Sequence, residues 1–238
     1  MLKFLSKYRG LSPWEIYVAS LNPDIWLKMT EANAAAFVAD GNWGTAGGTA
    51  SVSTAGGAFF GATSVTPSDS SRTSFYRTAV NDACYISTTA VAYLNTATIV
   101  CALKYDSAGS SGSTQIIYRD QSLTNGGGWF LDFSGTNIAF RVRGANITTG
   151  YATSNVKNGS PHLIGLSISA SAYALYVDGV SVASGAIGGS TAARSGWCWS
   201  SNTSPFNAQA MAGWYGDFIT WTITFTATDH ANLYAHWI

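Results

Sequence analysis

Charged side chains are scarce in this sequence. Of 238 residues, only 12 are Lys or Arg and 12 are Asp or Glu, so 10% of the chain is charged and the formal net charge is zero. A soluble domain usually carries about 25%. A chain without a basic field has little to hold the phosphates of nucleic acid or of an anionic membrane, so we expect neither as a partner. A net charge near zero also favours self-association, and we therefore expect copies of this chain to contact one another.

Paired cysteines, long apolar runs and an export signal are also missing. Cys84, Cys101 and Cys198 show none of the short spacings of zinc or redox sites, so we expect buried free thiols. No run of 18 apolar residues could span a bilayer. No apolar stretch of a signal peptide's length precedes Pro13 either. We therefore expect synthesis in a cytosol, with no signal peptide and no transmembrane segment.

The sequence contains instead short apolar runs with a period of two, separated by Gly, Asn, Asp and Ser. Asp178-Gly179 predicts a two-residue hairpin turn, because both central residues of such a turn need positive φ. Residues 41–61 and 107–113 predict long loops with weakly specified strands between them. The predicted strands are residues 25–29, 83–87, 98–105, 115–119, 129–133, 138–143, 162–169, 173–177, 180–183 and 217–225. Ten or more strands imply two stacked antiparallel sheets.

Helix signals are confined to the two ends of the chain. Ser12-Pro13 offers an N-cap and a proline at the first helical position, and this helix should stop before Asn22-Pro23. Thr228-Asp229 predicts the cap of a short C-terminal helix. We therefore predict an N-terminal arm and helix, residues 1–20, followed by one all-β domain, residues 21–238.

Three motifs follow one another along the chain. Asp40-Gly41-Asn42-Trp43-Gly44-Thr45 follows the first predicted strand, Pro161-His162 opens an alternating strand, and Leu175-Tyr176-Val177-Asp178-Gly179 forms the hairpin. In this order they resemble the laminin-G-like, concanavalin-A-like jelly-roll superfamily, in particular its members among virion proteins of tailed bacteriophages. The resemblance covers the chain from Trp14 onward. It implies an all-β, two-sheet antiparallel jelly-roll sandwich with a packing role for His162.

The sequence shows none of the common arrangements of catalytic residues. Glycosidases of this fold need two carboxylates at a fixed separation, and the only glutamates, Glu15 and Glu31, share no strand. No Gly-x-Ser-x-Gly elbow or zinc-type histidine spacing occurs. We therefore predict a non-enzymatic protein without a cofactor. The resemblance leaves only calcium as a candidate ligand, at Asp106, Asp120 and Asp132.

Aromatic residues in or near predicted loops are the candidates for contact with a glycan or a protein partner: Trp43, Trp197, Trp199, Trp214 and Tyr215. Trp197 and Trp199 would share one face if their segment is a strand, which fits a buried pair as well as a sugar cleft. Aromatic residues of this kind mark a core or a protein contact more often than a sugar platform.

These observations lead to a non-enzymatic structural protein of a bacteriophage virion, which decorates or cements the capsid or forms part of the tail. Its partners would be other virion proteins and copies of itself. The anchor candidates are Leu2, Lys3, Phe4, Leu5, Lys7 and Arg9, and a frayed terminus is the competing interpretation. The alternative function is a carbohydrate-binding module or receptor-binding adhesin that holds a host glycan through Trp-bearing loops. A divergent hydrolase ranks last.

Overall fold

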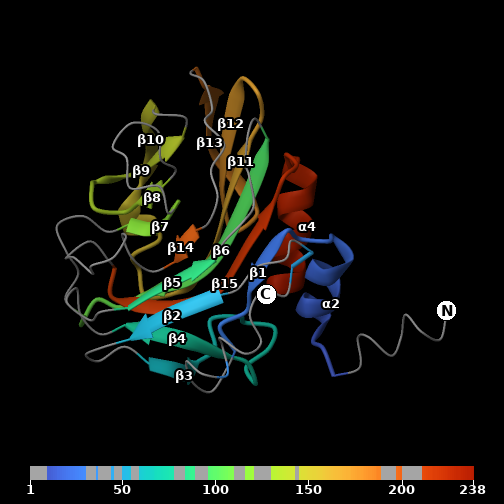
Figure 1. The fold of residues 1–238 in the computed structure, drawn as a ribbon. Helices are drawn as coiled ribbons and strands as arrows, with labels where there is room; N and C mark the ends of the chain where they lie inside the picture. Colours follow the sequence, from blue (N-terminus) through green and yellow to red (C-terminus); the bar gives the residue numbers. More distant parts are fainter. Residues whose placement is uncertain are drawn as a thin grey trace.

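The computed structural model describes residues 10–30, 36, 44–45, 50–54, 59–77, 84–88, 96–109, 116–120, 130–142, 145–188, 197–199 and 211–238. Within these residues the chain forms two antiparallel sheets, two short α-helices and a 3₁₀ turn, η1 (Thr153–Asn155) (Figure 1). The all-β sandwich predicted from the sequence, with a helix near each end, is therefore confirmed.

Sheet A contains eight strands in the described part of the chain. These are β1 (Ile25–Leu27), β3 (Phe59–Thr63), β4 (Thr73–Arg77), β6 (Ala97–Tyr105), β11 (Pro161–Ile168), β12 (Ala172–Val177), β13 (Val180–Ala186) and β15 (Gly213–Trp221). Their order is β13-β12-β11-β6-β15-β4-β3, and β1 pairs separately with the second half of β15. Strands β6 and β15 therefore lie at the centre of the sheet.

Sheet B contains seven strands in the described ranges. These are β2 (Ala50–Thr54), β5 (Cys84–Thr88), β7 (Ile116–Asp120), β8 (Phe130–Asp132), β9 (Asn137–Val142), β10 (Ala145–Ala152) and β14 (Trp197–Trp199). Their order is β10-β9-β8-β7-β14-β5-β2. Every strand pair in both sheets is antiparallel.

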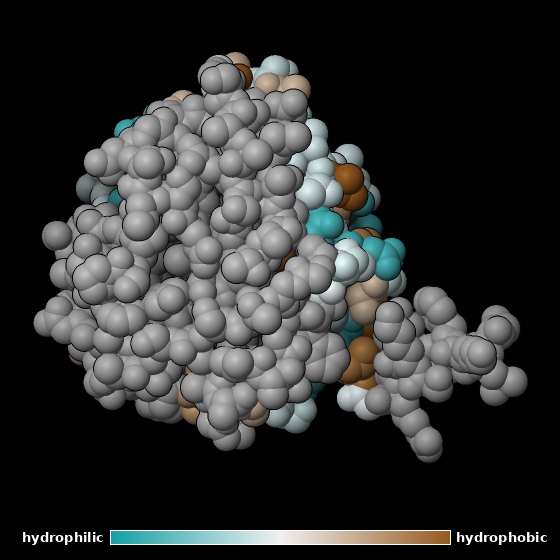
Figure 2. All heavy atoms as spheres, in the orientation of Figure 1, coloured by the Kyte–Doolittle hydropathy of each residue, from teal (hydrophilic) through white to brown (hydrophobic). Residues whose placement is uncertain are grey.

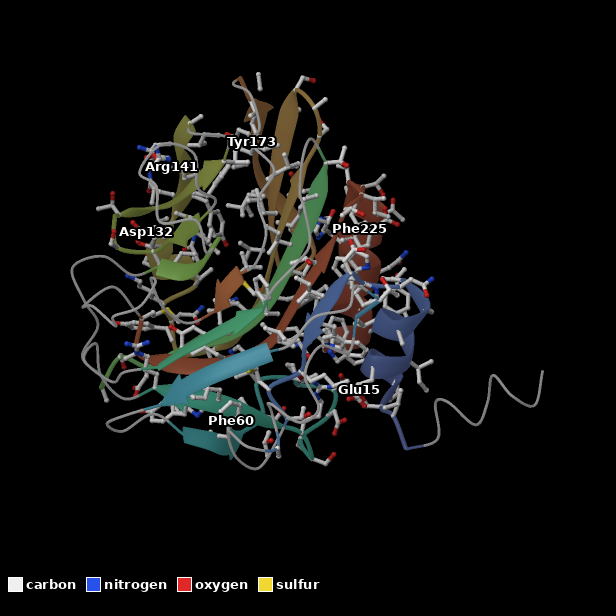
Figure 3. The ribbon with its side chains drawn as sticks, in the orientation of Figure 1. Glu15, Phe60, Asp132, Arg141, Tyr173 and Phe225 are labelled. Carbon is white, nitrogen blue, oxygen red and sulfur yellow. The ribbon has the colours of Figure 1, made fainter. Side chains whose placement is uncertain are left out.

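The main core lies between the sheets. Alternate residues of β9, namely Ile138, Phe140 and Val142, are fully buried and join inward-facing residues of sheet A in one hydrophobic cluster. Tyr173 of β12, labelled in Figure 3, meets Phe140 edge to face with ring centroids 4.9 Å apart. Cys101 is a buried free thiol in this core, as predicted, and burial raises its pKa.

A second core covers the outer face of sheet A. It is built by helices α2 (Pro13–Ser20) and α4 (Ala227–Trp237), which lie side by side against the strands (Figure 1). The cluster includes Trp14, Trp26, Trp221 and Trp237, all at most 2% exposed. Because β6 and β15 supply both cores, they are continuous buried runs, as strands covered on both faces usually are. The boundary expected at residue 20, between an N-terminal arm and the β domain, thus separates α2 from sheet A, although both contribute to this second hydrophobic cluster.

Both helices begin with a capping box. Ser12 and Glu15 exchange hydrogen bonds at the start of α2, which ends before Asn22-Pro23 as predicted. The N-cap of α4 is Thr226, whose side chain accepts from the backbone N–H of Asp229. The prediction that Thr228 would provide the cap was wrong, because Asp229 occupies the third helical position, where it bonds back to Thr226.

The β12–β13 hairpin has the predicted turn. Asp178 and Gly179 both adopt positive φ, 51° and 77°. One Asp178 carboxylate oxygen lies 2.7 Å from His162 Nδ1, and the other accepts from the backbone N–H of Leu163 at 2.9 Å. The histidine and the hairpin aspartate therefore stabilise each other, which gives His162 the structural role that the resemblance implied.

Several strands differ from the predicted set. Strands β4 and β10 lie where no strand was expected, and β2 and β3 begin within a stretch interpreted as a loop. The last strand is Gly213–Trp221, earlier in the chain than the predicted 217–225. The chain leaves the sheet after Trp221 because Phe225 turns back onto Trp221, with ring centroids 4.6 Å apart, before α4 begins.

Exposed large hydrophobic residues are scattered over the described surface. Those most exposed are Ile16, Val180, Ile223 and Ile238. Figure 2 shows hydrophobic and hydrophilic residues intermixed along the edge where α2 and α4 lie. Isolated apolar residues of this kind are normal on a protein surface. Neither helix in the described part is of a length and hydropathy that would carry it across a membrane.

Candidate functional site

A hollow on sheet A is lined by Thr63, Ser64, Lys104 and Trp214. Its cavity volume is about 80 Å³, and it is open to solvent. Drug-sized ligand pockets run from about 300 to 1,000 Å³. The hollow is therefore much smaller than such a pocket and could receive only part of a ligand, with the rest in solvent.

The strand register brings the hollow's residues together. Trp214 of β15 lies opposite Tyr76 of β4 on one side and opposite Lys104 of β6 on the other. The Tyr76 and Trp214 ring centroids are 4.5 Å apart, and Lys104 Nζ is 4.7 Å from the Trp214 ring centroid. Cross-strand neighbours of this kind interact directly. The indole ring is thus flanked by an aromatic ring and an ammonium group.

Asp106 holds Tyr76 in place. The Tyr76 hydroxyl donates to Asp106 Oδ2, while Asp106 Oδ1 accepts from the backbone N–H of Ala108 at 2.9 Å. The backbone N–H of Asp106 donates to Ala212, two residues before Trp214. These bonds hold the turn after β6 and fix the ring beside Trp214.

The rim of the hollow is rich in hydroxyl groups. Ser64 Oγ donates to the carbonyl of Thr66, and the backbone N–H of Thr66 donates back to Ser64 Oγ at 3.0 Å. Ser74 donates to the carbonyl of Thr63 at 2.6 Å, which fixes the end of β3. The side chain of Thr63 is exposed and makes no hydrogen bond within the described residues. It is therefore free to bond a ligand hydroxyl.

The aromatic candidates from the sequence have different positions. Trp214 lines the hollow, whereas its neighbour Tyr215 is fully buried between the sheets and donates its hydroxyl to Met211 at 2.6 Å. Tyr215 was therefore wrong as a contact residue, because alternate residues of β15 face opposite sides of the sheet. Trp197 and Trp199 lie two apart in β14, so they share a face as expected, but their side chains are outside the described atoms.

Other candidates lie wholly or partly outside the described residues. Trp43 and the anchor segment, residues 1–9, are among them, and Asp120 is described only as backbone in β7. Asp132 accepts from the backbone N–H and the hydroxyl of Ser134, each at 2.8 Å, which makes it a turn residue. Across the described ranges, no three His, Cys, Asp or Glu residues are grouped to hold a metal ion.

A buried ionic cluster joins α2 to sheet A, and no pattern in the sequence predicted it. Asp217 of β15 accepts from the indole N–H groups of Trp14 and Trp26, each at 2.8 Å. Arg72 donates to both Asp217 oxygens, at 2.8 and 2.9 Å. Asp217 is only 1% exposed, so its carboxylate is satisfied by protein groups and not by water.

Glu15, labelled in Figure 3 at the base of α2, completes the cluster. Glu15 Oε1 lies 3.0 Å from Lys28 Nζ and 3.1 Å from Arg72 Nη1. Burial alone would raise the pKa of the Glu15 carboxyl, but the Ser12 N–H and the cations of Arg72 and Lys28 outweigh it and hold that pKa below its usual range. Both acids of the cluster are thus paired with cations and buried where α2 meets the sheet, which suits a structural clamp.

A serine and a histidine are paired beneath α4. Ser167 Oγ lies 2.8 Å from His230 Nε2 and 3.2 Å from Thr98 Oγ1. A nucleophile next to a base is a catalytic arrangement, yet all three residues are buried and Tyr176 stacks on the His230 ring at 3.9 Å. Burial lowers the pKa of His230 to about 4. A neutral, enclosed imidazole of this kind packs α4 against the sheet.

No protein-family model and no curated protein matches the chain. Solved structures match it in fold. The receptor-binding domain of botulinum neurotoxin C/D mosaic serotype is 12% identical with a TM-score of 0.62, over 91% of this chain and 54% of that one. A botulinum neurotoxin type C structure, whose cell entry is described as dependent on two ganglioside molecules, is 13% identical with a TM-score of 0.64, over 94% and 53%.

A third neighbour is domain 4 of AbnA, a GH43 extracellular arabinanase from Geobacillus stearothermophilus, in complex with arabinotriose. It is 9% identical with a TM-score of 0.61, over 89% of this chain and 98% of that domain. The chain spans about half the length of the toxin domains it matches and nearly all of the arabinanase domain. These likenesses establish the β-sandwich fold. None of these three neighbours is a bacteriophage protein.

Proposed function

We propose that this chain is a non-enzymatic carbohydrate-binding domain in which one sugar ring stacks on Trp214 at the hollow. The observation that carries the proposal is a partly exposed indole at an open hollow with a hydroxyl-bearing rim. Ligand sites commonly combine an apolar or aromatic wall with a few placed polar groups. Trp214 would supply the wall, and Thr63 and Ser64 would bond sugar hydroxyls.

Lys104 has to move for a sugar to stack. Its ammonium lies over the Trp214 ring, while Tyr76 lies against the same ring. A cation–π contact at an exposed site contributes only about 0.5 to 1 kcal/mol, and a lysine stem is flexible. The side chain can therefore swing from the ring as the sugar arrives. We expect weak binding, with a Kd between about 10 μM and 1 mM, or roughly −7 to −4 kcal/mol.

The fold neighbours support this proposal more than assembly into a virion. The arabinanase domain that this chain matches over nearly its whole length was solved with arabinotriose, and a toxin neighbour is described with gangliosides. The virion hypothesis rests on the sequence resemblance, on the neutral charge and on the missing export signal. A receptor-binding adhesin would also bind a glycan, so the proposed sugar binding at Trp214 would serve either kind of protein.

The test is binding of the purified chain to an array of plant, bacterial and animal oligosaccharides, followed by calorimetry with the best ligand. Trp214→Ala should abolish binding and Trp214→Phe should keep part of it, because a smaller ring still stacks. Ile223→Ala, at a residue 57% exposed outside the hollow, is the control and should bind as the wild type. Unaltered binding by Trp214→Ala, or no binding to any glycan, would overturn the proposal.

A further inference from the structure

Lys104 differs from the cations of the buried ionic cluster and from Lys157. The basic groups in the buried ionic cluster are paired: Lys28 with Glu15, and Arg72 with Glu15 and Asp217. Lys157 donates to the carbonyl of Phe133. Lys104, in contrast, makes no side-chain hydrogen bond or ion pair within the described residues. Its ammonium instead lies over the Trp214 ring.

The unpaired ammonium lies in the hollow itself. Lys104 is among the described residues that line it. Asp106, two residues later, does not line the hollow, and its carboxylate already accepts from Tyr76 and from Ala108. Among the described residues that line the hollow, the charge is therefore positive. In a chain with so few charges, this lysine stands out as a group that a ligand could complement.

We propose that the hollow selects sugars that carry a carboxylate, with Lys104 as the residue that sets this preference. This inference rests on the proposed function. The sugar ring would take the place of the ammonium on the indole face, and the displaced Lys104 would pair with the carboxylate. A neutral sugar also displaces the ammonium but offers it only hydroxyl oxygens, without a countercharge. A carboxylate adds the attraction of opposite charges to the hydrogen bond, so the acidic sugar gains an interaction that the neutral one lacks.

Two natural sources share this chemistry, namely uronic acids and sialic acids. One arm of the experiment compares oligogalacturonate with its methyl ester, which keeps the ring and removes the charge. The other arm compares sialyllactose with lactose. Calorimetry on the whole chain gives the ratio of the two Kd values in each arm, and the arm with the larger ratio identifies the source.

We expect the wild type to bind the acidic member of one pair about three- to tenfold more tightly at low salt. The preference should shrink between about 0.05 and 0.5 M NaCl as the charge is screened, roughly in line with the shortening Debye length. Lys104→Met, which keeps the stem and removes the charge, should bring the ratio to about one. Lys104→Arg should restore most of the preference.

The outcomes separate this inference from the proposed function. Equal binding of acidic and neutral partners by the wild type, or a preference that survives in Lys104→Met, would overturn the role of Lys104 while sugar binding at Trp214 stands. An absence of binding to every member of both pairs and to the array would overturn the proposed function. Thermal melting of each variant shows that the fold is retained, so that a lost preference reports on the hollow.

Discussion

At the scale of single residues, Asp217 determines how the second core can form. Its carboxylate accepts hydrogen bonds from Trp14, Trp26 and Arg72. Replacing the carboxylate by an amide, in Asp217→Asn, leaves Arg72 without its full countercharge in a buried site. Removing one partner of a buried pair typically destabilises by about 3 to 5 kcal/mol. We expect a loss of this size in the free energy of unfolding, measured with urea.

Asp69→Asn is the matched control for that substitution. Asp69 also accepts from a neighbour, Ser71, at 3.1 and 2.5 Å, but these bonds are exposed. Its replacement should therefore change stability by at most about 1 kcal/mol. Equal losses in the two variants would mean that burial of Asp217 does not matter to the fold.

The same residue shows where sequence patterns stop being informative. The partners of Asp217 lie 145 to 203 residues away along the chain, and no local period or spacing connects them. The sequence shows that charged residues are scarce, but it does not show that four of them lie together in the buried ionic cluster. The hollow was only half visible: Trp214 was a candidate, but Tyr76 and Lys104 reach it through the pairing of β15 with β4 and β6.

At the scale of elements, the features that depend on a few adjacent residues were predicted from the sequence, whereas a strand that depends on its place in the sheet was not. The Ser12-Pro13 helix start and the Asp178-Gly179 turn depend on a few adjacent residues, and both are present. Strand β10 (Ala145–Ala152) contains Asn146, Thr148, Thr149 and Gly150 and lies at the edge of sheet B, where one face need not be apolar. Its pattern was therefore too polar to signal a strand.

Helix α4 is fixed to sheet A by His230, and this makes the fold sensitive to mild acid. The His230 ring lies in a notch that exists because Gly165 has no side chain, since a Cβ there would be 2.5 Å from the ring. The pKa of His230 falls from the ordinary 6.5 to about 4 in the folded chain because the ring is buried. Protonation therefore favours the unfolded chain as the pH falls between these values, and above about pH 6.5 the group has little effect.

By about pH 5 the loss due to His230 should reach about 2 kcal/mol relative to neutral pH. Urea unfolding at the two pH values measures it. Carboxyl groups with lowered pKa, such as Glu15 and Asp229, titrate below this window, so they add little to it. His230→Gln keeps a hydrogen-bonding side chain without the titration and should lose most of the difference. A difference that persists in this variant would assign the acid sensitivity to other groups.

At the scale of the whole molecule, the two cores are one structure because they share strands. Ile99 and Leu103 of β6 face the core between the sheets, whereas Val100 and Ala102 of the same strand face the helices. Without the helices, the apolar side chains on the outer face of these shared strands would be exposed to water, which would destabilise the sheet that both cores share. We therefore expect α2 to be as necessary to the β-sandwich as a strand, although residues 1–20 were expected to form an arm.

Shortening the chain tests this expectation. A chain that begins at Leu21 lacks Trp14 and Val18, both fully buried, and lacks Glu15, which leaves Lys28 without its carboxylate. Loss of a buried Trp side chain alone destabilises by about 3 to 5 kcal/mol, which is comparable to the total stability of many domains, about 5 to 15 kcal/mol. A chain that begins at Gly10 keeps these contacts and should melt as the full chain does. The Leu21 chain should melt far lower or fail to fold. Equal melting temperatures for the two shortened chains would show that α2 is a separable arm, because no part of the sandwich would then depend on it.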